Sequence, residues 1–142
     1  MESREPLELC EEIRKTACKY GLQIVYAFGS RSREIRALVE GRIARLSPGL
    51  SDVDVAVKPR QPLTVEQKVE IGIRFEDLFQ VPRVDVVVLS EAPVFLAFEI
   101  VTGELLFAQD PTYEAEYQLY IMRRTAELTH YQKARQAMIL GA

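Results

Sequence analysis

Three aspartates in two apolar stretches are the residues of this sequence best suited to chemistry. Asp52 and Asp54 open the run Ser51–Val57, and Asp85 lies inside Val84–Leu89. Because alternate residues of a strand point to the same face, Asp52 and Asp54 are predicted to project side by side. Carboxylates in apolar strands need compensating positive charge, and neither run contains a lysine or arginine. Two magnesium ions, which prefer hard oxygen ligands, are the predicted compensation.

A second feature, the turn Gly29–Ser30, suggests what the metal would act on. It ends the apolar run Leu22–Phe28 and precedes a predicted helix. Free backbone N–H groups at the start of a helix can bind a phosphate. Magnesium and phosphate held together favour chemistry on a nucleotide.

Each of these features also has an ordinary structural explanation. A Gly-Ser pair is a common turn. Asp52 and Asp54 can solvate the edge of a strand, and Asp85 can form an ion pair with Arg83 or Arg74. Their order along the chain favours the functional interpretation: a strand, the Gly-Ser turn, a helix, a strand with two acids, a helix, and a strand with the third acid.

Apolar periodicity predicts the elements that position these residues. Four strands are expected, at Leu22–Phe28, Asp52–Val57, Val84–Leu89 and Glu104–Phe107. Five helices are expected, at Pro6–Tyr20, Ser30 to about Leu46, Val65–Phe79 with Thr64 as its cap, Val94–Val101, and a long one from Pro111. The predicted fold is α+β, a small mixed sheet flanked by helices.

Two helices carry the clearest predicted core stripes. The first is expected to bury Leu9, Cys10, Ile13, Ala17 and Tyr20, and the third Val65, Val69, Gly72, Phe75 and Phe79. Cys10 and Cys18 fall in one helix about 12 Å apart, too far for a disulfide, so they are predicted to be free.

Size and composition agree with one compact cytoplasmic domain. The chain has 142 residues, of which 48% are hydrophobic and 27% charged. No apolar run approaches the roughly 18 residues needed to span a bilayer, and the first residues, Met1–Pro6, do not resemble a signal sequence. We therefore expect a cytoplasmic protein with no membrane partner.

Charge is unevenly distributed along the chain. The net charge is −3, which does not favour direct binding of nucleic acid. The segment from Arg31 to Arg45 is nevertheless +3, with five arginines against two glutamates, so the remainder is −6. This basic segment is either a solvated helix face or a local positive field for a triphosphate or an acidic partner.

Taken together, these stretches resemble the DNA polymerase β-type nucleotidyltransferase superfamily, specifically its minimal nucleotidyltransferase (MNT) branch. The matching residues are Phe28–Arg33, Ser51–Val57, Arg83–Leu89 and the tail Ala92–Phe107. The resemblance implies a single nucleotidyltransferase domain over residues 1–142. It also implies a role for each matching residue. Gly29, Ser30 and Arg33 would bind ATP, and Asp52, Asp54 and Asp85 would be the catalytic and metal-binding residues.

Two departures from the family pattern concern the region after the Gly-Ser turn. Glu34 follows Arg33 where the family usually has glycine. The gap between Ser30 and Asp52 is also about twice the usual one, because of the extra segment Glu34–Leu50. This segment is either a harmless extension or a structure that crowds the nucleotide pocket.

Members of the MNT branch are widely paired with HEPN-domain toxins, and this implies a partner. The resemblance predicts an antitoxin that transfers AMP from ATP to a hydroxyl, expected to be a tyrosine hydroxyl, of a HEPN toxin. The long last helix, with Arg123 and Arg124, is either its contact surface or a helix packed on the sheet. The alternative function is neutralisation by binding alone. A ribonuclease using Arg124 and His130 is disfavoured, because one helix cannot supply the helical bundle in which that pattern is found.

Overall fold

The computed structural model describes residues 6–49 and 51–141. The predictions about residues 1–5 therefore lie outside the described residues. The same holds for residues 1 and 142, the ends of the predicted domain, and for residue 50, the end of the extra segment. The elements are α1 (Pro6–Tyr20), β1 (Leu22–Phe28), α2 (Ser32–Val39), β2 (Val53–Pro59), α3 (Val65–Phe79), β3 (Val84–Val88), the 3₁₀ turn η1 (Leu89–Glu91), α4 (Val94–Val101), β4 (Glu104–Ala108) and α5 (Pro111–Ile139).

The predicted mixed sheet is confirmed, and its strand order is β3-β2-β1-β4. Strand β1 runs antiparallel to both of its neighbours, β2 and β4, whereas β2 and β3 are parallel. The central strand β1 is covered on both faces, which explains its nearly unbroken apolar sequence. Strand β3 lies at one edge, so Asp85 belongs to an edge strand.

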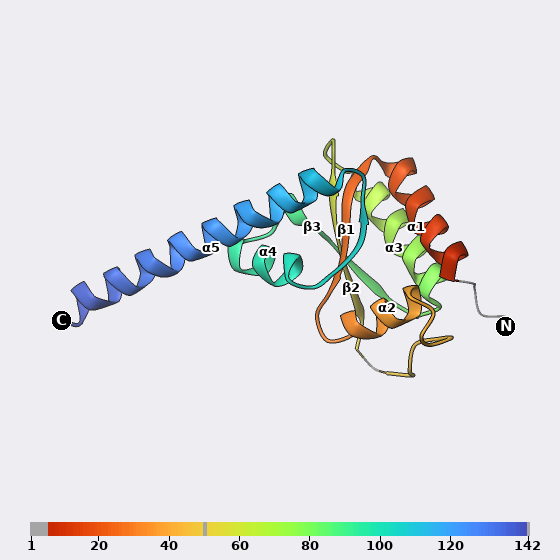
Figure 1. The fold of residues 1–142 in the computed structure, drawn as a ribbon, viewed down its shortest axis with the longest axis horizontal. Helices are drawn as coiled ribbons and strands as arrows, with labels where there is room; N and C mark the ends of the chain where they lie inside the picture. The colour runs from red at the N-terminus through yellow and green to blue at the C-terminus, as the bar shows by residue number, and fades with distance from the viewer. Residues whose placement is uncertain (1–5, 50, 142) are drawn as a thin grey trace.

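Helices cover the two faces of the sheet differently (Figure 1). Helices α1 and α3 lie on one face, which we call the α3 face, and their core includes Ile13, Val55 and Phe75. Helix α4 and the first part of α5 lie on the other, which we call the α4 face, where Tyr26, Ile100 and Ile121 are buried. Two separate apolar cores therefore flank one sheet.

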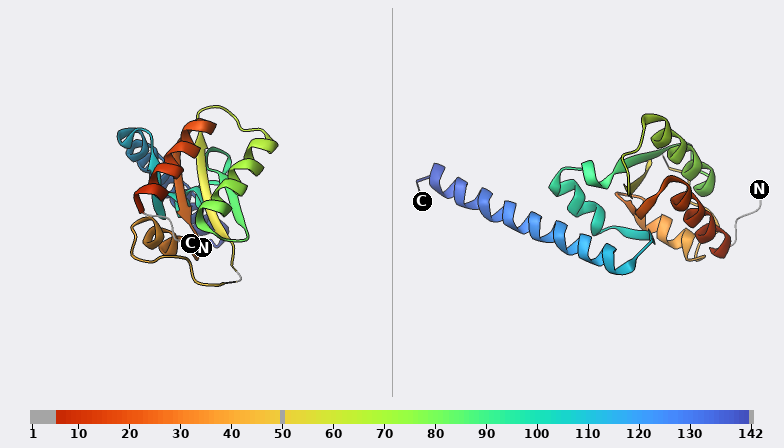
Figure 2. Two further views of the ribbon diagram at one scale, coloured as in Figure 1. Left: turned by 90° about the vertical axis from the view of Figure 1, so that its right-hand side faces the viewer. Right: turned by 90° about the horizontal axis from the view of Figure 1, so that it is seen from above.

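Helix α5 continues far beyond the sheet, as two views show (Figures 1 and 2). Its first turn is capped by the Asp110 side chain, and the buried Glu114 accepts a hydrogen bond from the Tyr26 hydroxyl. Residues 130–141 are all exposed, which agrees with the prediction that His130 is a surface residue. No helix in the described part of the chain is long and apolar enough to cross a membrane.

Two predictions, about α2 and α1, are corrected. Helix α2 spans Ser32–Val39, shorter than expected, because the chain turns at Gly41 and continues as a loop. Cys10 and Cys18 are free, as predicted, but exposed, because α1 turns Leu9 rather than Cys10 toward the core.

Helix α3 begins with the predicted cap: Thr64 and Gln67 form a capping box. Its buried residues are Ile71, Gly72, Phe75, Leu78 and Phe79. The predicted burial of Gly72, Phe75 and Phe79 is therefore confirmed, whereas Val65 and Val69 are exposed. Helix α3 packs against β3 and α1. Its apolar residues extend around more of the helix than these two elements cover, so some of them are exposed to solvent.

Candidate active site

Side chains alternate between the two faces of the sheet along β2 and β3, and this alternation places Asp54 and Asp85 on the α4 face. Val53, Val55 and Val57 pack in the α3-face core, so Asp54 and Ala56 point the opposite way. Asp54 is in register with Asp85 of the neighbouring strand. Cross-strand partners lie side by side, so these two carboxylates share one small area of the sheet.

Asp52 lies immediately before β2, which begins at Val53 rather than at Asp52 as predicted, and it stands two residues before Asp54. The side chains of Asp52 and Asp85 are 38% and 44% exposed. The expectation that these carboxylates are buried in apolar strands is therefore corrected: they lie at the open end of the sheet, next to its edge. This position leaves them accessible to a ligand.

Asp54 is partly buried, and its ionisation is opposed by its surroundings. Burial raises the pKa of the Asp54 carboxyl, and the negative charges of Asp85, Asp52 and Glu99 raise it further. Glu99 comes from α4, on the same face. The sequence analysis missed this fourth acid, whose only signal is a single charge within the apolar helix Val94–Val101. The site thus carries excess negative charge.

Arg83 supplies the nearest positive charge. Its Nε lies 3.5 Å from Asp52 Oδ2 and 3.4 Å from Asp85 Oδ1, and the side chain is 69% exposed. The predicted alternative pairing of Asp85 with Arg83 is thereby confirmed, whereas Arg74 instead contacts Glu12 and Thr16 of α1. The arginine stands two residues before Asp85, a spacing that places both on one face of the strand.

The Gly-Ser turn packs directly against the acidic cluster. Gly29 has φ +79°, and a Cβ atom there would lie 2.5 Å from Asp54 Oδ2. Both the left-handed backbone and the close approach of the carboxylate require glycine at this position. The predicted phosphate-binding turn and the predicted metal ligand are therefore in contact.

The residues after Gly29 remain open to solvent. The turn is closed by a hydrogen bond from the Ser32 N–H to the Gly29 carbonyl (3.2 Å), so α2 begins at Ser32 rather than Ser30. Ser30 and Arg33 are both exposed. Arg33 forms no ion pair with any residue in the described ranges, so its guanidinium is available to a ligand.

The extra segment is fastened to the start of α2 by Arg31 and Glu34. The buried Arg31 guanidinium donates hydrogen bonds to the carbonyls of Ser47 (2.5 Å) and Ser51 (3.3 Å) and to the Glu34 carboxylate (3.2 Å). Glu34 in turn accepts hydrogen bonds from the Ser47 N–H and hydroxyl. Desolvation opposes ionisation of Glu34, but these hydrogen bonds from Ser47 and Arg31 outweigh it and lower its pKa.

This pairing changes the interpretation of the basic segment. Arg31, Arg36 and Arg42 each pair with a nearby glutamate, Arg36 with both Glu40 and Glu104. Much of the positive charge of the segment is thus compensated locally. Glu34, the departure from the family pattern, is held by the loop of the extra segment.

The acidic cluster is the candidate site for a divalent cation. In their present positions, no three His, Cys, Asp or Glu side chains of the described residues are close enough together to hold a metal ion. However, the three aspartates offer hard oxygen donors close together. The negative charges of Asp85, Asp52 and Glu99 raise the pKa of Asp54, so Arg83 does not neutralise the cluster. The oxygen donors of this set are of the kind that magnesium prefers, and in this structure Asp52 and Asp85 are paired with Arg83.

Comparison with known proteins places this fold in a family. The family model described as Polymerase beta, Nucleotidyltransferase matches residues 11–112. The chain therefore belongs to the polymerase β nucleotidyltransferase family, as the sequence motifs predicted. No curated protein sequence matches the chain.

Several solved structures share the fold. A crystal structure described as a toxin-antitoxin with AMP-PNP is 24% identical, with a TM-score of 0.64 over 92% of this chain and 94% of that chain. A structure of a tri-AMPylated Shewanella oneidensis HEPN toxin in complex with its MNT antitoxin is 23% identical, with a TM-score of 0.59 and coverage of 95% and 96%. A toxin-antitoxin MntA-HepT structure is 22% identical, with a TM-score of 0.59 and coverage of 92% and 93%. At these identities the similarity establishes the fold.

Proposed function

We propose that this protein is a magnesium-dependent nucleotidyltransferase that transfers AMP from ATP to a hydroxyl, expected to be a tyrosine hydroxyl, of a HEPN-type toxin, and so acts as its antitoxin. The observation that carries the proposal is the contact of the Gly29 turn with Asp54, which is itself in register with Asp85. Phosphate binding and metal binding would thus occur at one point of the sheet. Family membership and the toxin-antitoxin structures with the same fold support it.

Each residue would have a distinct part in the reaction. The backbone at Gly29 and Ser30 would bind the β- and γ-phosphates of ATP, with Arg33 adding positive charge. Asp52 and Asp54 would hold two magnesium ions, and Asp85 would bind one of them. Bound magnesium would neutralise charge on the phosphates and lower the pKa of the attacking hydroxyl.

The proposed chemistry is an in-line displacement. The acceptor oxygen forms a bond to the α-phosphorus as the bond from that phosphorus to the pyrophosphate oxygen breaks. Asp85 would accept the hydroxyl proton, and pyrophosphate would leave with the electron pair. The products are an AMP ester of the acceptor and free pyrophosphate.

The test is incubation with magnesium, α-labelled ATP and the protein encoded by the adjacent gene. We expect label on that partner. Asp54→Asn should reduce the labelling rate 100-fold or more, on the order of the several kcal/mol that metal-assisted catalysis supplies. Glu8→Gln is the matched control, since Glu8 is an exposed acid on the distant α1, and it should label at the wild-type rate. Absence of label with all four nucleotides would contradict transfer.

One observation favours a second function, neutralisation by binding alone. Arg83 already contacts two of the three carboxylates that the chemistry needs. The two functions differ in cells that express the toxin. If binding suffices, the double variant Asp52→Ala with Asp54→Ala still neutralises the toxin. If transfer is required, that double variant fails while remaining folded and bound to its partner.

A further inference from the structure

Of the three aspartates, only Asp52 lies outside the strands of the sheet. Asp54 and Asp85 are paired with each other across β2 and β3, and Asp54 is also in register with Phe28 of β1. Pairing with both neighbouring strands therefore fixes the backbone of Asp54. Asp52 precedes the first residue of β2, Val53. The position of its backbone therefore depends on the loop that leads into the strand.

That loop is the last part of the extra segment, and its described residues are anchored in two ways. The Leu46 side chain is buried in the α3-face core. Residues 47–49 and 51 are exposed, so they gain little from apolar burial. Hydrogen bonds from Arg31 and to Glu34 hold this exposed stretch instead.

Arg31 reaches this stretch near both of its ends. Its guanidinium donates hydrogen bonds to the carbonyls of Ser47 (2.5 Å) and Ser51 (3.3 Å). Between these two residues, a Cβ atom on Gly49 would lie 3.7 Å from Arg31 Cζ. The Arg31 side chain is only 7% exposed. A planar guanidinium with several donors in fixed directions holds its acceptors in one geometry, which a flexible ammonium group does not.

The backbone of Arg31 directly follows the Gly29–Ser30 turn. Arg31 occupies the N-cap position of α2, but its side chain forms no capping hydrogen bond. Short side chains that accept a hydrogen bond from the helix are preferred at this position, whereas the Arg31 side chain extends to the loop. Arg31 thus connects the turn, through its backbone, with the residue before Asp52, through its guanidinium.

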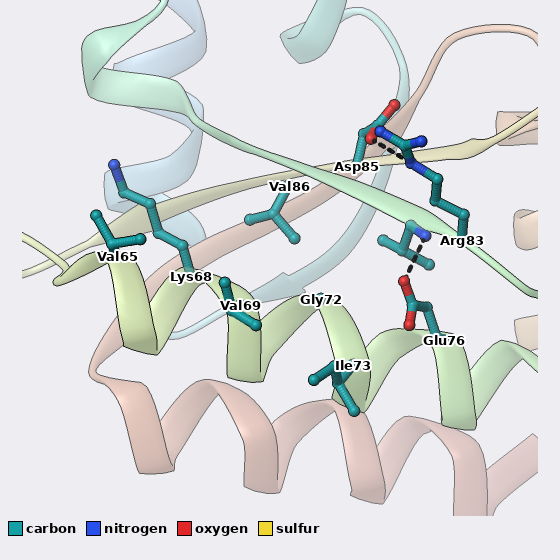
Figure 3. A pocket seen from close by; sticks show the side chains of 10 residues that line it. Val65, Lys68, Val69, Gly72, Ile73, Glu76, Arg83, Asp85 and Val86 are labelled. Carbon is teal, nitrogen blue, oxygen red and sulfur yellow. Dashed lines mark hydrogen bonds and ion pairs between the residues drawn. The ribbon is translucent and has the colours of Figure 1, made fainter.

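Arg83, the other arginine close to Asp52, is placed differently. Its side chain is 69% exposed and projects beside Asp85 (Figure 3). It contacts the Asp52 carboxylate itself, at 3.5 Å, so it would compete with a cation for that group. Arg31 instead holds the backbone beside Asp52 and leaves the carboxylate free for a ligand.

We propose that Arg31 is a positioning residue, which holds the backbone before Asp52 at a fixed distance from the Gly29–Ser30 turn. This inference rests on the proposed function and adds how the first carboxylate is kept in place. It also gives the extra segment a role, because the Ser47 carbonyl and the anchored Leu46 fix the Arg31 guanidinium. Glu34, the departure from the family pattern, neutralises this buried charge.

The test replaces Arg31 with methionine, which keeps an unbranched side chain but removes the guanidinium. Arg31→Met should lower kcat for AMP transfer about 10- to 100-fold, the effect of displacing a reacting group by about 1 Å. Arg31→Lys, which keeps the charge and one donor, should recover part of this loss. The matched control is Arg36→Met, because Arg36 also lies on α2 and donates to a backbone carbonyl, that of Leu105 (3.0 Å). It should keep the wild-type kcat.

A double-mutant cycle with Asp52→Asn separates positioning from a general loss of stability. If Arg31 acts through Asp52, the double variant Arg31→Met with Asp52→Asn should be no slower than Asp52→Asn alone. Losses that multiply in the double variant would overturn the proposal.

Hydrogen exchange of the free protein tests the positioning without any chemistry. The Val53 N–H donates to the Arg83 carbonyl (3.3 Å). Its exchange should be at least tenfold faster in Arg31→Met, and faster to a smaller extent in Arg31→Lys, while the Val55 amide inside β2 is unchanged. An unchanged Val53 rate, or equal acceleration at Val53 and Val55, would overturn the proposal even where transfer occurs. If only Val53 exchanges faster and no AMP is transferred by the wild type, the positioning role stands and the transferase proposal fails.

Discussion

The two faces of the sheet are built from the same strands but are used differently. On the α3 face, β2 and β3 contribute mainly valines, which pack under α1 and α3. On the α4 face, the same strands carry Ala56 and Val87 near α4 but Asp54 and Asp85 at the open end. Alternation along a strand thus lets one pair of strands contribute to both the apolar core and the candidate active site.

The two faces contribute differently to the free energy of folding. The α3 face gains free energy from apolar burial. The open end of the α4 face brings three carboxylates together, and burial and mutual repulsion raise the pKa of Asp54. We therefore expect substitutions on the α3 face to lower stability, and substitutions of these acids to lower activity while stability is kept or increased.

The largest effect on stability should come from the α3 face. Phe75 is fully buried and stacks on Phe79 with ring centroids 5.6 Å apart. Phe75→Ala should lower the free energy of unfolding by about 3 to 5 kcal/mol, through lost burial and the cavity that remains. Chemical denaturation measures this loss. Phe95→Ala on α4, where the ring is 47% exposed, is the matched control and should cost less than about 1 kcal/mol.

A smaller effect, of opposite sign, is expected at Asp54. Its raised pKa means that the folded state keeps its proton to higher pH than the unfolded chain does. The metal-free protein should therefore lose stability as the pH rises from the usual aspartate pKa of 3.8 to the higher folded value. At pH 7, Asp54→Asn should raise the Tm by about 3 °C, the shift that roughly 1 kcal/mol produces in a chain of this size.

The effect of magnesium on the Tm of the wild type and of Asp54→Asn tests whether Asp54 is a metal ligand. Magnesium should raise the Tm of the wild type, because it binds the folded state and neutralises the repelling carboxylates. It should have little effect on the Tm of Asp54→Asn. A magnesium shift of equal size in both proteins would show that Asp54 is not a ligand.

The smallest effect concerns Arg83, whose ion pairs with Asp52 and Asp85 would oppose the proposed metal binding. Arg83→Ala should lower the magnesium concentration for half-maximal transfer two- to fivefold, since an exposed ion pair contributes about 0.2 to 1 kcal/mol. The assay uses saturating partner and ATP. Arg14→Ala, which removes an exposed ion pair with Glu11 on α1, should leave the magnesium requirement unchanged. An increased magnesium requirement in Arg83→Ala would instead assign Arg83 to binding substrate.

Much of the fold follows from local sequence patterns. The boundaries of α1, α3 and α4 were predicted to the residue, because glycine, capping residues and proline mark their ends. The mixed sheet predicted from these strands is also present, and within it Asp54 pairs with Asp85. Periodicity within each element was sufficient for these predictions.

What could not be predicted depends on packing between elements. Periodicity identifies the apolar positions of α3 but does not indicate how much of its surface a neighbour covers, so Val65 and Val69 were wrongly placed in the core. The anchoring of the extra segment by Arg31 depends on carbonyls 16 and 20 residues away. Glu99 reaches the site only because α4 packs across the sheet.

The contact between Gly29 and Asp54 has a consequence for how ligands bind. No side chain larger than hydrogen fits between the turn and the carboxylate, so the position of one restricts the position of the other. A ligand that orders Asp54 therefore also orders the backbone that would receive a phosphate. Nucleotide and metal should then bind with positive cooperativity, each increasing the affinity for the other by the same factor.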